Sequence, residues 1–266
     1  MRGTTNQDAW RRYLEGERLF SINSEPRMEK ARAKFAEAIE LDCEFARAHG
    51  YLSYVLTRSV QLGWLGDSEL VRAEKHARKA VELDPHDYAV FWDLGYCLLG
   101  QGDLDGALKE YETALDLYEN FTDLLDRKHG LLAEIAEAYI FDGRPKDAIK
   151  LLKRAKRTPD WYSWNLGWAY YNAREYDAAL KELECIRSRP GDDEHVFDVQ
   201  LMIAACYAHK GNKVMAKNNL NLFETALNTT LDLERLRKRV TFRNAADADH
   251  WIDGLRGATD ETQKSD

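Results

Sequence analysis

Aromatic side chains at helical spacing are the residues in this sequence best suited to binding another molecule. One face of an expected helix carries, at intervals of three, four and three residues, Trp161, Trp164, Trp168 and Tyr171. The corresponding face of other expected helices carries Trp10, Tyr13, Tyr54, Trp92 and Tyr96. Such rings anchor many protein interfaces, because each combines a large apolar area with one polar group or edge. We expect them to line a groove for an extended or helical peptide. Two alternatives remain open: the rings pack between neighbouring helices, or the chain's own tail fills the groove.

Residues with catalytic or metal-binding chemistry do not form a convincing site in the sequence. None of the seven histidines lies in an H-E-x-x-H motif, and the acidic clusters at 84–87 and 192–195 suit helix N-caps better than metal binding. The segment 102–106 lacks the third ligand and the terminal Glu of a calcium loop. Cys97 and Cys206 have apolar neighbours and no base near them in the sequence, which indicates packing. We therefore expect no enzyme, no cofactor and no metal.

The amino-acid composition limits which kinds of partner the protein is expected to bind and where in the cell it is expected to lie. The chain has 38 Lys and Arg against 46 Asp and Glu, and its net charge of −8 disfavours general nucleic-acid binding. No window has about 20 uninterrupted apolar residues, and the amino terminus lacks a secretory apolar core. The four cysteines form no C-x-x-C pair, which disfavours zinc and disulfide frameworks. We expect a reduced, cytoplasmic protein that binds neither membrane nor nucleic acid.

An internal repeat organises the chain. A pattern of three residues recurs six times: a small residue, a residue four positions later that is larger in most copies, and an apolar residue three positions after that. Its copies begin at Ala31, Ala73, Ala107, Ala148, Ala179 and Ala216. This spacing is one stripe of an α-helix. Upstream of each copy lies a second small residue, at Gly16, Ser53, Gly95, Ala136, Gly167 and Ala204. Small residues there allow two antiparallel helices to approach closely, so each unit is expected to be a helical hairpin.

The period resembles that of the tetratricopeptide repeat, which is 34 residues. The third copy fits the pattern best, at Phe91, Leu94, Gly95, Leu98, Gly102, Ala107, Tyr111 and Ala114. The resemblance, which covers about residues 6–228, implies an all-α fold: a right-handed α-solenoid of six such hairpins. It also implies that the first helix of each hairpin lines a concave surface. Pro26 and Pro145 are expected at the start of second helices, and Pro85, Pro159 and Pro190 in turns between repeats.

The expected helices follow this frame. First helices are expected near 6–20, 44–59, 86–100, 125–141, 160–173 and 194–210. Second helices are expected near 27–41, 69–83, 103–118, 144–157, 175–188 and 212–226. Insertions are expected near 60–70 and 120–127. The array should span 1–228, with short capping helices near 230–239 and 245–256 inside residues 229–257 and a flexible tail at 258–266.

The carboxy-terminal run carries a second resemblance. From Leu233 to Leu255, including Phe242, Asp247 and Trp251, it is similar to the ending of the repeat module in proteobacterial class III adenylate cyclases. The proline of that pattern is replaced by Ala245, and no part of the chain resembles the cyclase catalytic domain. The resemblance implies a regulatory or partner-binding module. The basic run 235–239 suits a helix carboxy terminus, with docking to an acidic surface as the alternative.

Three functions follow as hypotheses. The first is a non-catalytic scaffold or adaptor that binds a protein or peptide partner in the aromatic groove. The Lys/Asn/Lys/Arg clamp of domains that bind chaperone tails is absent, since the matching positions begin with Tyr13 and Glu17. The second is a regulatory sensor for a small ligand in a signalling enzyme of the adenylate cyclase kind. The third is self-association as a homo-oligomer, through a terminal repeat or the apolar insertion with Leu62, Trp64 and Leu65.

Overall fold

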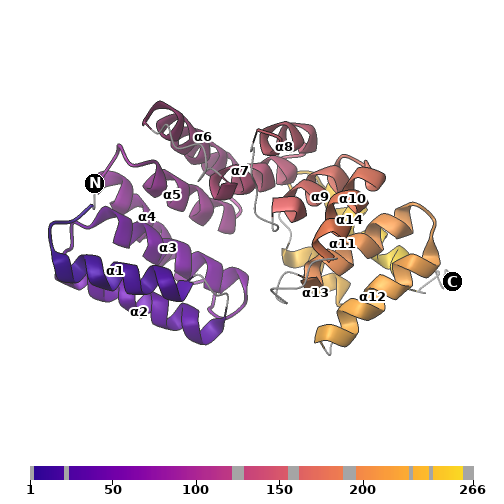
Figure 1. Ribbon diagram of the computed structural model, residues 1–266, viewed down its shortest axis with the longest axis horizontal. Coiled ribbons are helices and arrows are strands. Elements are labelled where there is room, and N and C mark those ends of the chain that lie inside the picture. Colours follow the sequence, from indigo (N-terminus) through magenta and orange to yellow (C-terminus); the bar gives the residue numbers. More distant parts are fainter. Residues whose placement is uncertain are drawn as a thin grey trace. The chain divides into compact units, whose positions relative to one another are not determined.

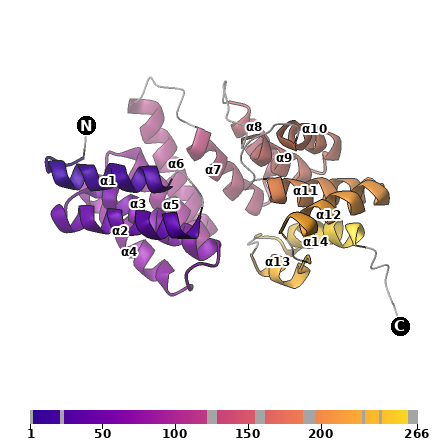
Figure 2. The ribbon, with the colours of Figure 1, turned by 60° about the horizontal axis from the view of Figure 1, so that its bottom comes forward.

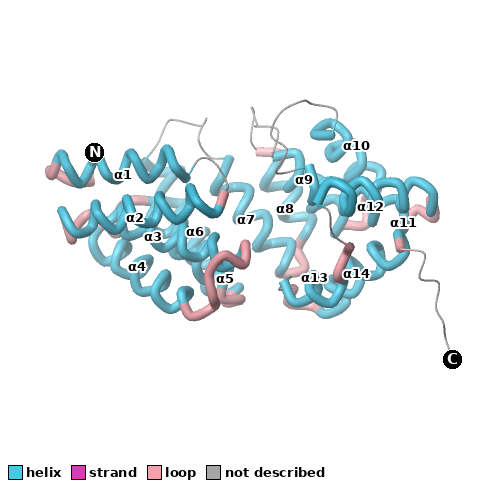
Figure 3. The backbone as a smooth tube through the Cα atoms, turned by 90° about the horizontal axis from the view of Figure 1, so that it is seen from below, coloured by secondary structure: helices cyan, strands magenta, loops and turns pink. Residues whose placement is uncertain are grey.

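The structure is a computed structural model that describes residues 3–20, 24–121, 129–154, 162–187, 196–227, 230–239 and 242–259. Within these ranges the chain forms helices joined by turns, with no strand. Figure 3 shows this helical character along the described backbone. The chain is an all-α solenoid whose hairpins are distributed over two compact units, Met1–Leu125 and Asp126–Asp266. The boundary falls inside the insertion that the sequence places between the third and fourth repeats.

In unit 1, residues 1–125, the described helices pair into three hairpins, whose arrangement can be followed in Figure 1. Its helices are α1 (Gln7–Phe20), α2 (Glu25–Leu41), α3 (Ala46–Gln61), α4 (Glu69–Leu83), α5 (Tyr88–Gly100) and α6 (Leu104–Phe121). Within each hairpin the first helix packs on the second, as α1 does on α2. Successive hairpins join because α3 contacts both α2 and α5, and α4 also contacts α5. The first helices α3 and α5 therefore lie side by side, and the rings of Tyr13 and Tyr51 join α1 to α3.

Unit 2, residues 126–266, repeats this arrangement and adds two terminal helices (Figure 2). Its hairpin helices are α7 (His129–Phe141), α8 (Pro145–Leu152), α9 (Tyr162–Asn172), α10 (Tyr176–Arg187), α11 (Val196–His209) and α12 (Lys213–Leu227). They are followed by α13 (Leu233–Arg239) and α14 (Ala245–Ala258). The last of these, α14, packs on α11, α12 and α13. Most bounds lie within a few residues of the sequence prediction; α8 ends at Leu152, and residues 155–161 lie outside the described ranges.

Small residues in the first helices explain how closely the two helices of a hairpin approach. A Cβ atom added to Gly16 would lie 2.7 Å from the Phe35 ring, and one added to Gly95 would lie 2.6 Å from the Tyr111 ring. Gly167 meets Leu183 in the same way, at 2.7 Å. These contacts join the two small-and-large stripes that the sequence predicts to face each other. The close approach places bulky second-helix side chains in the core, where Phe35 and Tyr111 are fully buried.

Turns and caps also follow local sequence. Pro26 and Pro145 lie in the first turn of α2 and α8, which confirms their expected place at helix starts, where the missing N–H is tolerated. Pro85 lies in the turn between α4 and α5, whereas Pro159 and Pro190 lie outside the described residues. The side chain of Asp87 caps α5 by accepting a hydrogen bond from the N–H of Ala89 at 3.1 Å.

One turn has a residue other than glycine at a position where the equivalent turns have glycine. The turns after α5, α7 and α11 each place a glycine at positive φ, between 76° and 82°. At the equivalent position after α9 the chain has Arg174, with φ 67°. A residue with a Cβ atom is strained in this left-handed region. Local hydrogen bonds hold the turn: the N–H of Arg174 donates to the carbonyl oxygen of Tyr171 at 3.0 Å, and its guanidinium donates to that of Asn172 at 3.1 Å.

Candidate binding surface

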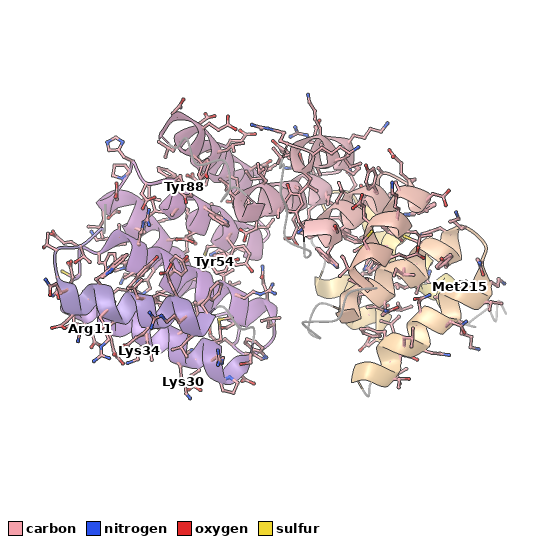
Figure 4. All side chains as sticks on the ribbon, in the orientation of Figure 1. Arg11, Lys30, Lys34, Tyr54, Tyr88 and Met215 are labelled. Atoms are coloured by element: carbon pink, nitrogen blue, oxygen red, sulfur yellow. The ribbon has the colours of Figure 1, made fainter. Side chains whose placement is uncertain are left out.

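The first helices of unit 1 present a connected row of aromatic rings. On α1, Trp10 stacks on Tyr13 with centroids 5.3 Å apart. Between α3 and α5, Tyr54 stacks on Tyr96 at 4.1 Å and 12°, and the Tyr96 hydroxyl donates a hydrogen bond to Oε1 of Gln61 at 2.5 Å. Figure 4 shows Tyr54 within unit 1. The structure therefore brings these predicted residues of α1, α3 and α5 to the first-helix side of their hairpins.

Burial divides these rings into two groups. Tyr13 and Tyr96 are buried, whereas Trp10, Tyr54 and Trp92 keep part of their surface exposed. The Tyr13 ring contacts Phe35 and Phe45, and burial, with the neighbouring Tyr51 and Glu17, raises the pKa of its hydroxyl above the ordinary range. Buried rings thus support exposed ones, which gives the surface a fixed shape.

Tyr51 belongs to the same surface but is missing from the sequence prediction. Its ring lies edge-on to Tyr13 at 5.4 Å and to Phe20 at 6.1 Å, and it links α3 to α1. Burial is the main cause that raises the pKa of its hydroxyl. A signal was present, since Tyr51 lies three residues before Tyr54 and therefore near the same helix face.

In unit 2 the predicted aromatic row runs along α9. Trp164 stacks on Trp168 with centroids 6.3 Å apart, and Trp168 stacks on Tyr171 at 5.7 Å and 5°. Trp164 is partly exposed, whereas Trp168 and Tyr171 are buried. The fourth member of the predicted row, Trp161, lies outside the described residues.

The chain's own carboxy-terminal segment, residues 242–258, covers this row. Trp251 of α14 lies edge-on to Trp168 at 4.9 Å and to Tyr171 at 5.3 Å. Phe242 lies 6.1 Å from Trp168 and edge-on to Phe141 of α7 at 5.3 Å. In unit 2 the structure therefore realises the alternative in which the chain's own tail occupies the aromatic surface.

A polar cluster that no sequence pattern indicates lies at the contact between α14 and the hairpins. The Nε2–H of His209 donates to the carbonyl oxygen of His250 at 3.1 Å, and the Tyr171 hydroxyl donates to the same oxygen at 3.2 Å. The two imidazole rings stack with centroids 4.1 Å apart, and Tyr176 stacks on His209 at 5.1 Å. Burial lowers the pKa of His250 to about 3, and the neighbouring His209 and Arg174 contribute to this shift. Burial also lowers the pKa of His209.

The other residues with potential chemistry have structural roles where the structure describes them. Among the described residues, no group of three or more His, Cys, Asp and Glu is placed to hold a metal ion. Burial raises the pKa of the Cys97 thiol, and it raises that of Cys206 to about 12. In the loop-like segment 102–106, Oδ1 of Asp103 accepts the N–H of Gly106 at 3.0 Å. The acidic cluster at 192–195 lies outside the described ranges.

Comparison with known proteins agrees with this hairpin geometry. Residues 68–120, which span α4 to α6, match the family model described as tetratricopeptide repeat. This part of the chain therefore matches tetratricopeptide repeats. These repeats generally form non-catalytic scaffolds that bind protein or peptide partners.

One curated relative shares part of the array. Over 122 residues the chain is 30% identical to the tetratricopeptide repeat-containing protein trd-1 of Caenorhabditis elegans. The match covers 46% of this chain but only 14% of the relative, so the chain spans a small part of that protein's length.

Solved structures share the fold at low identity. PilF of Pseudomonas aeruginosa matches with a TM-score of 0.59 and 16% identity, over 88% of this chain and 99% of its own. TTC0263 of Thermus thermophilus matches with a TM-score of 0.58 and 16% identity, over 74% of this chain and 98% of its own. A chain of the Cut9–Hcn1 hetero-tetramer of APC/C matches with a TM-score of 0.62 and 18% identity, over 93% of this chain and 46% of its own. In addition, no helix among the described residues is long and apolar enough to cross a membrane.

Proposed function

We propose that this repeat protein is a non-catalytic adaptor whose first-helix surfaces bind a helical or extended segment of a partner protein. The observation that supports the proposal is the packing of α14 on the first helices of unit 2. In unit 2 an amphipathic helix already rests on this kind of surface, with Trp251 against Trp168 and Tyr171. Because the hairpins repeat one pattern, the first-helix surface of unit 1 is suited to a similar segment.

The unit 1 surface is organised before a partner arrives. Tyr13 and Tyr96 are held in the core, and they fix the positions of Trp10 and Tyr54 by stacking at 5.3 and 4.1 Å. A preformed surface loses little conformational entropy on binding. Trp10, Tyr54 and Trp92 retain exposed area for contact, so they are the proposed anchors in unit 1. In unit 2 the partly exposed anchor is Trp164.

The adaptor proposal is tested first by capture from an extract of the native cell. Wild-type protein, Trp92→Ala and Trp64→Ala are immobilised and the captured proteins are identified. Trp64 is the matched control, a partly exposed tryptophan in the loop between α3 and α4. The candidate partner is then purified and its affinity is measured by calorimetry.

Loss of one anchor should weaken binding by about 2 kcal/mol, or roughly thirtyfold, for Trp92→Ala. Trp64→Ala should bind like the wild type. Equal affinity of folded Trp92→Ala and wild type would reject the unit 1 surface as the binding site, and Trp164→Ala then tests unit 2 by the same measurement.

The second candidate is a regulatory module of a signalling enzyme of the adenylate cyclase kind, which senses a small ligand at the tryptophan cluster. It is favoured by one observation: the segment that resembles the end of such modules is the one that packs on Trp168. A ligand screen by tryptophan fluorescence and melting temperature separates it from the adaptor.

The charge of −8 supports a protein rather than a nucleic-acid partner, and we propose a cytoplasmic location.

A further inference from the structure

The carboxy-terminal segment, residues 242–258, contacts the first helices of all three hairpins in unit 2. At α7, the N–H of Arg243 donates to the carbonyl oxygen of Phe141 at 2.8 Å, and its guanidinium pairs with Asp142 at 2.5 Å. At α9, Trp251 lies against Trp168 and Tyr171. At α11, α14 packs along the helix. The segment therefore crosses the first helices of successive hairpins.

The face of α14 that meets the hairpins has the composition of a ligand for an apolar surface. It buries Trp251, Ile252, Leu255 and Ala258, which are at most 6% exposed. Two glycines let the helix approach α11. A Cβ atom on Gly254 would lie 2.5 Å from the Tyr171 hydroxyl and 2.7 Å from Nε2 of His209, and one on Gly257 would lie 3.2 Å from the Cβ of Ala208.

Two further features lie at this contact. Arg174 has positive φ where the equivalent turns have glycine, and its guanidinium pairs with Asp247 of α14 at 3.1 Å. His209 and His250 stack ring on ring at the contact, so protonation of either ring places a charge in partly buried surroundings and weakens the packing of α14. Strain and a titratable pair at a contact are typical of segments that move.

We propose that residues 242–258 are an intramolecular ligand that covers a docking surface on α7, α9 and α11, and that a partner helix with an aromatic residue followed three positions later by glycine displaces it. The proposal rests on the proposed adaptor function and names the occupant of the unit 2 surface. Trp251 and Gly254 supply that pattern in cis. A partner helix binds once α14 has left, so the measured affinity equals the affinity of the open surface multiplied by the fraction of molecules in which the surface is open.

The experiment uses the full chain and a synthetic peptide of residues 242–259 labelled with fluorescein, read by fluorescence anisotropy. Two variants set the state of α14. Gly254→Val introduces a side chain where Tyr171, His209 and Ala205 leave no room, and so unseats the helix. Ala208→Cys with Gly257→Cys joins α14 to α11, because the two Cβ atoms would lie 3.2 Å apart, and a small outward shift of α14 brings them to the usual disulfide separation of about 3.8 Å.

We expect the peptide to bind Gly254→Val at least tenfold more tightly than the wild type. The oxidised double-cysteine variant should not bind, and reduction should restore the wild-type affinity. A peptide with Trp251→Ala is the matched control and should bind none of the proteins. Equal affinity of the peptide for the open, wild-type and locked proteins would overturn the proposal, as would binding of the control peptide.

Two features keep the outcome clear. If Gly254→Val does not fold by circular dichroism, then Trp251→Ala in the full chain, which removes the ring that packs on Trp168 and Tyr171, replaces it as the open variant with the same expected increase. The peptide assay involves no cellular partner. Its failure therefore rejects the intramolecular ligand alone, whereas failure of the Trp92→Ala capture experiment rejects the unit 1 surface.

Discussion

At the residue scale, the size of single side chains decides how the hairpins form. Gly16, Gly95 and Gly167 each lie against a bulky side chain of the second helix. Glycine is the weakest ordinary helix former, costing about 1 kcal/mol relative to alanine in a helix interior. Its presence at these positions is explained by the contact: Phe35, Tyr111 and Leu183 occupy the space that a Cβ atom would need.

We expect Gly95→Ala to destabilise the protein by about 1–3 kcal/mol, although alanine favours helices, because the added Cβ atom would lie 2.6 Å from the buried Tyr111 ring. The free energy of unfolding from urea denaturation measures the change. Gly66→Ala is the control, since its nearest neighbour would be 4.0 Å away, and it should change stability by less than about 0.5 kcal/mol. Equal effects of the two substitutions would contradict the packing explanation.

At the element scale, α14 combines the roles of cap and ligand. The sequence predicts this helix, and the structure places it on α11 with its tryptophan against α9. A cap at the end of a solenoid shields the last hairpin. Because α14 also reaches the fifth hairpin, its seat depends on side chains of two first helices and on the histidine pair between them.

The seating of α14 should weaken in acid. Both histidines have lowered pKa values when α14 is seated, so the unseated state binds more protons once the pH falls below about 6.5. The stabilisation is thus complete above pH 7 and is lost progressively as the pH falls from about 6.5 towards 3. Asp247, Asp253 and Arg174 also carry charge at this contact, and the measurement between pH 7.5 and 5.5 stays above the ordinary carboxyl range.

Hydrogen exchange of the α14 amides, corrected for intrinsic rates, measures this effect. Protection should fall by up to about tenfold for each histidine between pH 7.5 and 5.5. His209→Gln with His250→Phe keeps a donor and a stacked ring but removes both titrating groups, so its α14 protection should not respond. An equal response in this variant would show that other groups cause the pH dependence.

At the scale of the whole molecule, the two compact units each have a hydrophobic core. In repeat proteins stability is a sum of repeat terms and nearest-neighbour terms, so damage in one unit need not spread. Unit 1 also has its own partly buried histidine contact, in which Nδ1 of His49 lies 2.9 Å from Nδ1 of His76. Burial and the neighbouring His49 lower the pKa of His76 to about 4. Acid should therefore weaken both units.

We expect core cavities to act locally. Leu56→Ala in α3 and Ile203→Ala in α11 each remove a side chain that is fully buried, and each should cost about 2–5 kcal/mol. Hydrogen exchange by mass spectrometry should show lost protection in residues 24–121 for Leu56→Ala and in 162–227 for Ile203→Ala. Loss of protection throughout the chain in either variant would show that the units unfold together.

Local patterns of the sequence determined the helices, their order and the pairing of small and large stripes. Those features depend on contacts within one hairpin, so periodicity and the positions of Pro26, Pro145 and Gly95 were sufficient. The same patterns placed the aromatic residues on the first helices, but they could not separate exposed from buried rings.

Only the tertiary structure decided which rings are covered, and by what. The contact of Tyr171 with His250 joins residues 79 positions apart in the chain, and no helical period relates them. Burial of Trp168 and the lowered pKa of His250 both arise because α14 folds back onto α9 and α11. A helix that is amphipathic in sequence can bury its apolar face on any surface of matching shape, and the choice among such surfaces is made by packing in three dimensions.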